Sequence, residues 1–200
     1  GIINETTIWD DGFLDAVDVG PGMCLIDEWI RINSKKKYDD KGNIAKDGKI
    51  NKIILNKALR NFSYTAGAIS RKSFDTKDFE DFFNILHSSF FKGLSFKDAV
   101  ATLTEFTVSI LRDSLIFRGL PAHTRLILCG GGRKNNFLVE KLKEKSGVIK
   151  LIDEYGVDGD FVESQAFAYL AIRSYLKLPI SFPGTTGVKK PCSAGKIFQA

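Results

Sequence analysis

Two glycine-rich segments, each following an apolar run, constrain this chain more than any other feature. The first is Ala-Val-Asp-Val-Gly-Pro-Gly at residues 16–22, and the second is Leu-Ile-Leu-Cys-Gly-Gly-Gly at residues 126–132. Glycine lets the backbone approach a ligand closely and leaves N–H groups bare toward a cleft. Only the first segment adds a carboxylate, Asp18. We therefore expect two strand-to-turn units with the layout of a phosphoryl-transfer site.

The composition favours a folded protein without membrane or nucleic-acid partners. The 200 residues are 44% hydrophobic and 26% charged, enough for one sizeable core or two small ones. No apolar run approaches the roughly 20 residues that cross a bilayer, and residues 1–4 do not resemble a signal peptide, so we expect a cytoplasmic location. The net charge of +5 is spread over scattered lysines, apart from residues 35–37. Cys24, Cys129 and Cys192 are too widely spaced to predict a disulfide framework or a metal site.

Hydrophobic periodicity predicts an α/β fold of alternating strands and helices. A hairpin is expected at residues 6–19, and because of it we expect mixed rather than purely parallel sheet pairing. The chain is read as one domain, 1–200, with a mobile polar loop at 33–49 and a C-terminal tail at 179–200. Further strands are predicted at 125–129 and 148–152, and helices just after residue 22 and at 51–62, 77–91, 95–117, 135–145 and 161–178.

Asp18 is the first candidate for chemistry, because it ends a predicted buried strand directly before a glycine-proline turn. In that position a carboxylate can act as a general base or orient magnesium toward a substrate hydroxyl or water. It can equally be a turn aspartate that caps the following helix. Position alone leaves both interpretations open.

The second candidate is the turn Gly130-Gly131-Gly132, with Asn135 near the start of the next helix. The glycines would allow close approach of adenosine or phosphates, and the asparagine would contact the ligand or fix the loop. A tight strand-to-helix turn also needs glycine. The sequence contains neither GxxxxGK[ST] nor GxGxxG, so neither a P-loop nor a dinucleotide-binding fingerprint is predicted.

An acidic run precedes the last long helix, and most of its carboxylates are expected to be solvated charges near a helix start. Glu163 differs, because it lies one turn inside the helix and could point into a cleft and bind sugar hydroxyls. The run comprises Asp153, Glu154, Asp158, Asp160 and Glu163.

Residues 18–29, Asp-Val-Gly-Pro-Gly-Met-Cys-Leu-Ile-Asp-Glu-Trp, resemble the D-x-G-P-G-N-x-L-x-D-x-W signature of the anhydro-N-acetylmuramic acid kinase family. The resemblance continues, in the family's order, through nearly the whole chain. Its later motifs are residues 40–42, 45–48, 128–132 with Asn135, 153–156, Glu163, 166–171 and 185–187.

The resemblance implies an actin-like, ribonuclease-H-like ATPase fold and a sugar kinase of peptidoglycan recycling that uses ATP and Mg²⁺. Such enzymes open the 1,6-anhydro bridge of anhydro-N-acetylmuramic acid with water and phosphorylate the released 6-hydroxyl. Asp18 matches the family's general base, and Glu163 matches a sugar-side carboxylate. The nucleotide-binding residues that the resemblance implies are Gly20, Gly22, Gly130, Gly131, Gly132 and Asn135.

The chain also departs from the family pattern. Family members carry a phosphate loop and an arginine-bearing sugar-binding region upstream of the signature, so we expect this chain to be the C-terminal half, with little activity alone. Met23 replaces the usual asparagine, and Lys72-Ser73 lack the glycine-arginine that commonly follows. Two alternatives remain open. One is an interaction module that pairs with a separately encoded N-terminal half or with itself, and the other is a nucleotide binder that retains only the turn at 129–135.

Overall fold

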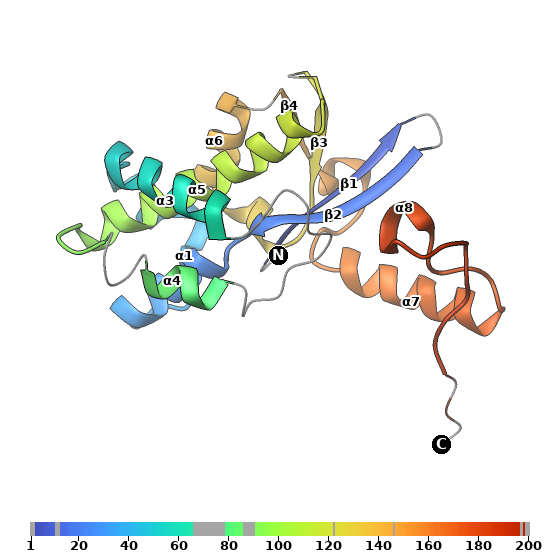
Figure 1. The fold of residues 1–200 in the computed structure, drawn as a ribbon. Helices are drawn as coiled ribbons and strands as arrows, with labels where there is room; N and C mark the ends of the chain where they lie inside the picture. Colours follow the sequence, from blue (N-terminus) through green and yellow to red (C-terminus); the bar gives the residue numbers. More distant parts are fainter. Residues whose placement is uncertain are drawn as a thin grey trace.

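The computed structural model describes residues 3–10, 13–65, 79–85, 91–121, 123–145, 147–196 and 198. Residues 11–12 of the expected hairpin and the Lys72-Ser73 pair lie outside them. The described part of the helix expected at 77–91 is α4 (Glu80–Ile85). Figure 1 shows a body of helices, a long hairpin and a C-terminal helical region at one side of the molecule.

The hairpin predicted near the start of the chain is confirmed. Strand β1 (Ile3–Asp10) pairs antiparallel with β2 (Phe13–Pro21), with an irregularity between Asn4 and Glu5. Val17 and Val19 of β2 are buried, and so is the Gly-Pro-Gly turn that follows. The end of β2 is therefore anchored in the core.

A second sheet contains the other glycine turn. Strands β3 (Arg125–Leu128) and β4 (Val148–Leu151) pair in parallel, and helix α6 (Asn136–Lys145) connects them. Parallel and antiparallel pairing are both present, as expected, but in the described residues they form two separate two-stranded sheets. The prediction of a single mixed sheet is therefore wrong for this part of the chain.

Helix α5 (Phe96–Phe117) is the centre of the body. Ser95 caps it by accepting a hydrogen bond from the Asp98 N–H at 3.1 Å, and the helix lies where the sequence predicts one, at 95–117. Every residue from 99 to 110 is buried, so the helix has no exposed face over three turns. The helix is buried on all sides because three helices that precede it in the sequence pack on it, and α6 and β2 do so as well.

Two apolar clusters lie beside α5. The larger includes residues of α1 (Cys24–Asn33) and α3 (Lys52–Thr65), and Phe62 meets Phe106 of α5 edge to face with ring centroids 5.6 Å apart. The smaller joins Val108 of α5 to α6 and to Ile149 of β4. Burial on both sides explains how α5 holds the two sheets together.

The segment 33–49 differs from the expected loop. It contains a turn of 3-10 helix, η1 (Asp40–Gly42), and a short helix, α2 (Asn43–Lys46). Buried Asp39 accepts hydrogen bonds from the N–H groups of Ile44 at 2.7 Å and Ala45 at 3.0 Å. These two apolar residues join the larger cluster, which is why the polar segment is ordered around them.

The C-terminal region contains α7 (Val162–Tyr175) and α8 (Pro183–Thr186). The chain then returns, and Ser181 and Cys192 form an antiparallel bridge. Helix α8 contacts β2, whereas α7 has no buried residue. The helix ends earlier than expected, because Lys177 adopts a left-handed φ of 59°. Among the described helices, none is both long enough and apolar enough to cross a membrane.

Candidate functional site

The first glycine turn joins β2 to α1 and is packed tightly against α5. A Cβ on Gly20 would lie 2.7 Å from Ile110 Cγ2, so only glycine fits there without movement of the core. Thr107 Oγ1 lies 3.1 Å from the carbonyl oxygen of Gly22 and 3.3 Å from that of Pro21. These contacts fix the backbone that carries Asp18 into the turn.

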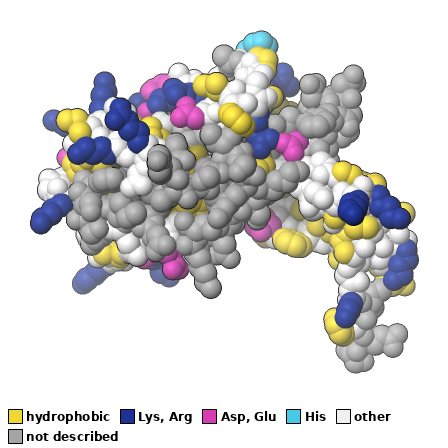
Figure 2. Space-filling model, in the orientation of Figure 1, with side chains coloured by type: hydrophobic (Ala, Val, Ile, Leu, Met, Phe, Trp, Pro, Cys, Tyr) yellow, Lys and Arg dark blue, Asp and Glu magenta, His cyan; other side chains and the backbone are white. Residues whose placement is uncertain are grey.

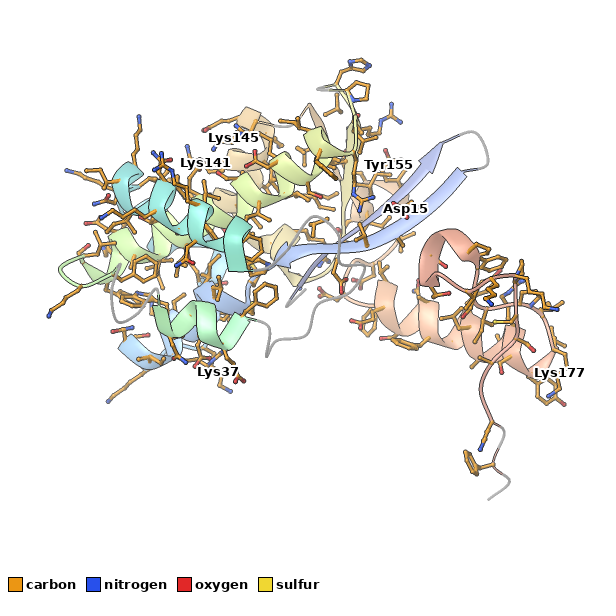
Figure 3. The ribbon with its side chains drawn as sticks, in the orientation of Figure 1. Asp15, Lys37, Lys141, Lys145, Tyr155 and Lys177 are labelled. Carbon is orange, nitrogen blue, oxygen red and sulfur yellow. The ribbon has the colours of Figure 1, made fainter. Side chains whose placement is uncertain are left out.

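Asp18 lies on β2 beside a small cavity of about 80 Å³ between β2, α3 and α5. Asp113, Ser114 and Arg118 at the end of α5 also line this cavity. Arg118 is paired with Asp15 of β2, and Figure 3 labels Asp15. A ligand of drug size usually occupies a pocket of roughly 300 Å³ or more. The space at Asp18 within the described chain therefore suits water better than a sugar.

The second glycine turn joins β3 to α6 through η4 (Gly131–Lys134). Gly130 has a left-handed φ of 74°, which the turn itself requires. Gly131 does not have a positive φ, and a Cβ placed on it would meet nothing within 4 Å. Within the described chain, neither backbone conformation nor packing therefore requires a glycine at 131.

Asn135 serves the fold of this second turn. Its Oδ1 accepts a hydrogen bond from the Leu138 N–H at 2.9 Å, which caps the first turn of α6. The residue is buried, and a Cβ on Gly42 would lie 2.3 Å from the same Oδ1. The sequence suggested that Asn135 either contacts the ligand or fixes the loop, and these contacts support the second role.

The two glycine turns lie side by side in the structure. A Cβ on Gly132 would lie 3.8 Å from Cγ of Met23, the residue that directly precedes α1. Met23 packs against both apolar clusters. The residue that replaces the family's asparagine therefore fills the space between the turns.

Arg133 is a structural residue of this site that the sequence analysis missed. Its buried guanidinium donates to both carboxylate oxygens of Asp153, at 2.7 and 3.0 Å, and to Asp160 at 2.7 Å. It also donates to the Gly130 carbonyl at 3.0 Å. The hydrogen bonds from Arg133 lower the pKa of Asp153 to about 2. The sequence signal that could have identified Arg133 is its position, directly after the glycine run and twenty residues before an acidic run.

The acidic run is thus tied to the second turn, because three of its members, Asp153, Asp158 and Asp160, form ion pairs with Arg133, whereas we expected solvated charges. The Gly130 N–H donates to the Gly159 carbonyl at 3.1 Å, and a Cβ on Gly159 would lie 2.2 Å from Arg133 Nε. Glu163, in contrast, is exposed on the first turn of α7. The described contacts bring the two glycine turns together but do not bring Glu163 to them.

A second cavity, of about 500 Å³, lies between α1 and α4. Asp27 lines it, and in the described part of the chain its buried Oδ1 has no hydrogen-bond partner. Burial raises the pKa of Asp27 to about 6. On the same helix, Arg31 pairs with Glu28 at 2.6 Å instead.

Fold and site together define the class: an α/β protein in which two strand-to-helix glycine turns, one with a carboxylate, meet beside a central helix. The sequence matches the Anhydro-N-acetylmuramic acid kinase family over residues 1–200. It is 46% identical to the anhydro-N-acetylmuramic acid kinase of Pelagibacter ubique over all of this chain and 53% of that protein. It is 38% identical to that of Caulobacter vibrioides, covering 98% of this chain and 51% of the relative.

The chain belongs to the anhydro-N-acetylmuramic acid kinase family. This confirms the resemblance that the motifs carry. A third relative, the kinase of Agrobacterium fabrum, is 35% identical over the whole chain and 52% of its own length. The chain therefore spans about half the length of the curated relatives it matches.

Proposed function

We propose that this chain supplies one half, the C-terminal half, of an ATP-dependent anhydro-N-acetylmuramic acid kinase with a ribonuclease-H-like fold. The observation that carries the proposal is the meeting of the two turns through Met23 and Gly132. One turn brings a carboxylate and the other brings a glycine, Gly131, that the fold itself does not need. A phosphoryl-transfer site needs both an activating base and backbone close to the nucleotide.

In the proposed reaction, Asp18 is the general base. It takes a proton from water as the water oxygen attacks the anomeric carbon of anhydro-N-acetylmuramic acid. The bond between that carbon and the bridging oxygen breaks, and its electron pair stays on O6. The O6 oxygen then attacks the γ-phosphorus of ATP, so that ADP leaves and N-acetylmuramic acid 6-phosphate forms. The cavity beside Asp18 has room for water, which supports this role.

The second turn fits a nucleotide. Gly131 leaves open space where adenosine or phosphate could approach the backbone, and Gly130 and Gly132 flank it. Gly20 and Gly22 would face the phosphates from the first turn. Asn135 would act on the nucleotide indirectly, by holding the turn in place.

Mg²⁺ is expected to arrive with ATP. In proteins it is commonly held by one or two carboxylates together with substrate phosphates. Within the described ranges, no group of three or more candidate ligand side chains is present, so a cage made of protein alone is not proposed. When bound, the ion would neutralise charge on the phosphates. Asp18, the carboxylate of the first turn, is the residue that would help to hold it.

The small space at Asp18 also supports the proposal that the chain alone has little activity. Phosphoryl transfer depends on positioning substrates from all sides of a cleft. Glu163 is the proposed sugar-binding carboxylate. The cavity of about 80 Å³ beside Asp18 is too small to enclose the sugar. Such an enzyme would act in the cytoplasm.

The test is an ATP titration of the chain, followed by a turnover assay with radiolabelled ATP and the anhydro sugar. We expect Gly131→Val to weaken ATP binding about tenfold or more with little change in the thermal unfolding curve, because a Cβ added at this position meets no protein atom within 4 Å. Ala171→Val, on exposed α7, is the matched control and should bind as the unmodified chain does. Equal ATP affinity of Gly131→Val, or rapid turnover by the chain alone, would contradict the proposal.

A further inference from the structure

The cavity of about 500 Å³ between α1 and α4 is distinct from the one beside Asp18 and has the size of a small-molecule pocket. Such pockets usually have volumes of about 300–1,000 Å³ and mostly apolar linings. Figure 1 shows α4 beside α1 in the body of the molecule. The apolar part of the lining includes Leu25 of α1 and the rings of Phe79 and Phe83, which are buried and belong to the larger apolar cluster. One wall of the cavity can therefore hold the apolar body of a ligand.

The cavity also contains a carboxylate that the described chain leaves incomplete. Oδ1 of Asp27 is buried and accepts no hydrogen bond from a described residue. Burial raises the pKa of Asp27 to about 6, so the group is mostly ionised at neutral pH. A buried ionised carboxylate without a donor costs free energy, which a bound N–H or O–H group offsets. The unpartnered oxygen therefore points to a ligand that carries a hydrogen-bond donor.

The charge around the cavity favours a cation over a neutral donor. Figure 2 shows lysine and arginine side chains at both ends of the molecule, and the chain as a whole has a net charge of +5. The described lining of the cavity has the opposite balance, with the carboxylates of Asp27, Glu28 and Glu80. Its one cation among these residues, Arg31, is already paired with Glu28 at 2.6 Å. Asp27 and Glu80 therefore leave two negative charges without a cation in the described lining.

We propose that this cavity is a binding site for a small organic ammonium ion with an apolar body. Its N–H groups donate to Oδ1 of Asp27, and its apolar part lies against the rings of Phe79 and Phe83. A metal ion fits less well, because it needs several oxygen ligands and the described residues include no group of three or more candidate ligand side chains. The site does not depend on the proposed kinase activity, and neither ATP nor the sugar enters its test.

The test is a titration of the isotope-labelled, full 200-residue chain with phenethylammonium chloride, followed through the amide chemical shifts. We expect saturable one-to-one binding with the largest shifts in α1 and α4, and the same for hexylammonium chloride, whose body is aliphatic. Phenethyl alcohol has a similar shape without the charge and should bind about tenfold more weakly, since hydrogen bonds between charged groups are the stronger ones. Phenylpropionate, which is an anion, should not bind measurably because it meets two carboxylates.

Asp27→Asn keeps the size of the side chain and removes its charge, and it should weaken binding of phenethylammonium about tenfold or more. The unfolding midpoint of this variant at pH 7 should equal or exceed that of the unmodified chain, because an unpaired buried charge is removed. This measurement separates a lost site from a lost fold.

Asp47→Asn is the matched control, because it also removes one aspartate charge but lies at the end of α2, paired with Lys97 at 2.7 Å. It should leave the affinity for phenethylammonium unchanged. The proposal is overturned by absence of saturable binding with both amines, or by equal affinity for phenethylammonium and phenethyl alcohol. Unchanged affinity in Asp27→Asn, an equal loss in Asp47→Asn, or chemical-shift changes confined to elements other than α1 and α4 would overturn it as well.

Discussion

Helices α5 and α7 belong to one chain and both are rich in apolar residues, yet they have opposite environments. Residues 99–110 of α5 are all buried, whereas α7 has no buried residue. Some buried polar side chains of α5 bond within the helix, for example Thr104, which donates to the Val100 carbonyl at 2.9 Å. The difference shows that the body completes its own core, while the side chains of α7 stay largely exposed within the described chain.

The largest expected difference between the two regions is in the response to the same substitution. Phe106→Ala on α5 should lower the free energy of unfolding by about 3–5 kcal/mol, because it leaves a cavity in the core. Phe167→Ala on α7 should change it by about 0.5 kcal/mol or less, since that ring is exposed. Urea unfolding followed by circular dichroism measures both. Similar losses of unfolding free energy at the two positions would contradict the distinction between a buried α5 and an exposed α7.

Two glycines with nearly the same backbone conformation provide the next comparison. Gly42 in the body and Gly187 after α8 have φ values of 77° and 72°. An added Cβ at Gly187 meets nothing within 4 Å, so Gly187→Ala should cost only the backbone strain, about 1–2 kcal/mol. At Gly42 the Cβ would lie 2.8 Å from the Phe137 N atom, which adds about 1–3 kcal/mol of overpacking. Equal melting temperatures for the two variants would argue against a tightly packed body.

A smaller effect is expected from Arg133, and it depends on pH. Arg133 lowers the folded pKa of Asp153 to about 2, below the unfolded value of about 3.9. The stability from this pair is therefore fully present above about pH 4 and is lost as the pH falls through about 2. The difference in melting temperature between the unmodified chain and Arg133→Gln should shrink over that range. Arg133→Lys, which keeps the charge, is the control. A difference in melting temperature between the unmodified chain and Arg133→Gln that stays constant from pH 5 to pH 2 would contradict this role of the pair.

The smallest effect concerns Asp27, a polar group of the body whose Oδ1 has no partner among the described residues. Burial raises its folded pKa to about 6, above the unfolded value of about 3.9. Its contribution is therefore most favourable below about pH 4 and is lost as the pH rises to about 6. Relative to Asp27→Asn, the unmodified chain should lose thermal stability over that interval and then level off.

Glu28→Gln, on the same helix, is the matched control for loss of one negative charge. A difference between Asp27→Asn and the unmodified chain that stays constant between pH 4 and pH 7 would mean that the Asp27 carboxylate is well solvated or paired in solution. In that case burial would not raise the pKa of Asp27 at this cavity.

The sequence predicted best those features that local signals determine. Ser95 marks the start of α5, and the two glycine segments mark strand-to-helix turns at the right places. Features that depend on distant contacts could not be predicted in this way. The carboxylate of Asp39 organises a turn that hydrophobic periodicity cannot detect, and burial of α5 on all sides depends on helices far away in sequence. Arg133 was missed because its partners, twenty or more residues later, looked like ordinary surface charges.

The most direct test of this account is hydrogen exchange of α5 and α7 in the chain. We expect the amides of α5 to be strongly protected, because that helix is buried within this chain. The amides of α7 should exchange much faster, because none of its residues is buried. Protection of α7 equal to that of α5 would contradict the account.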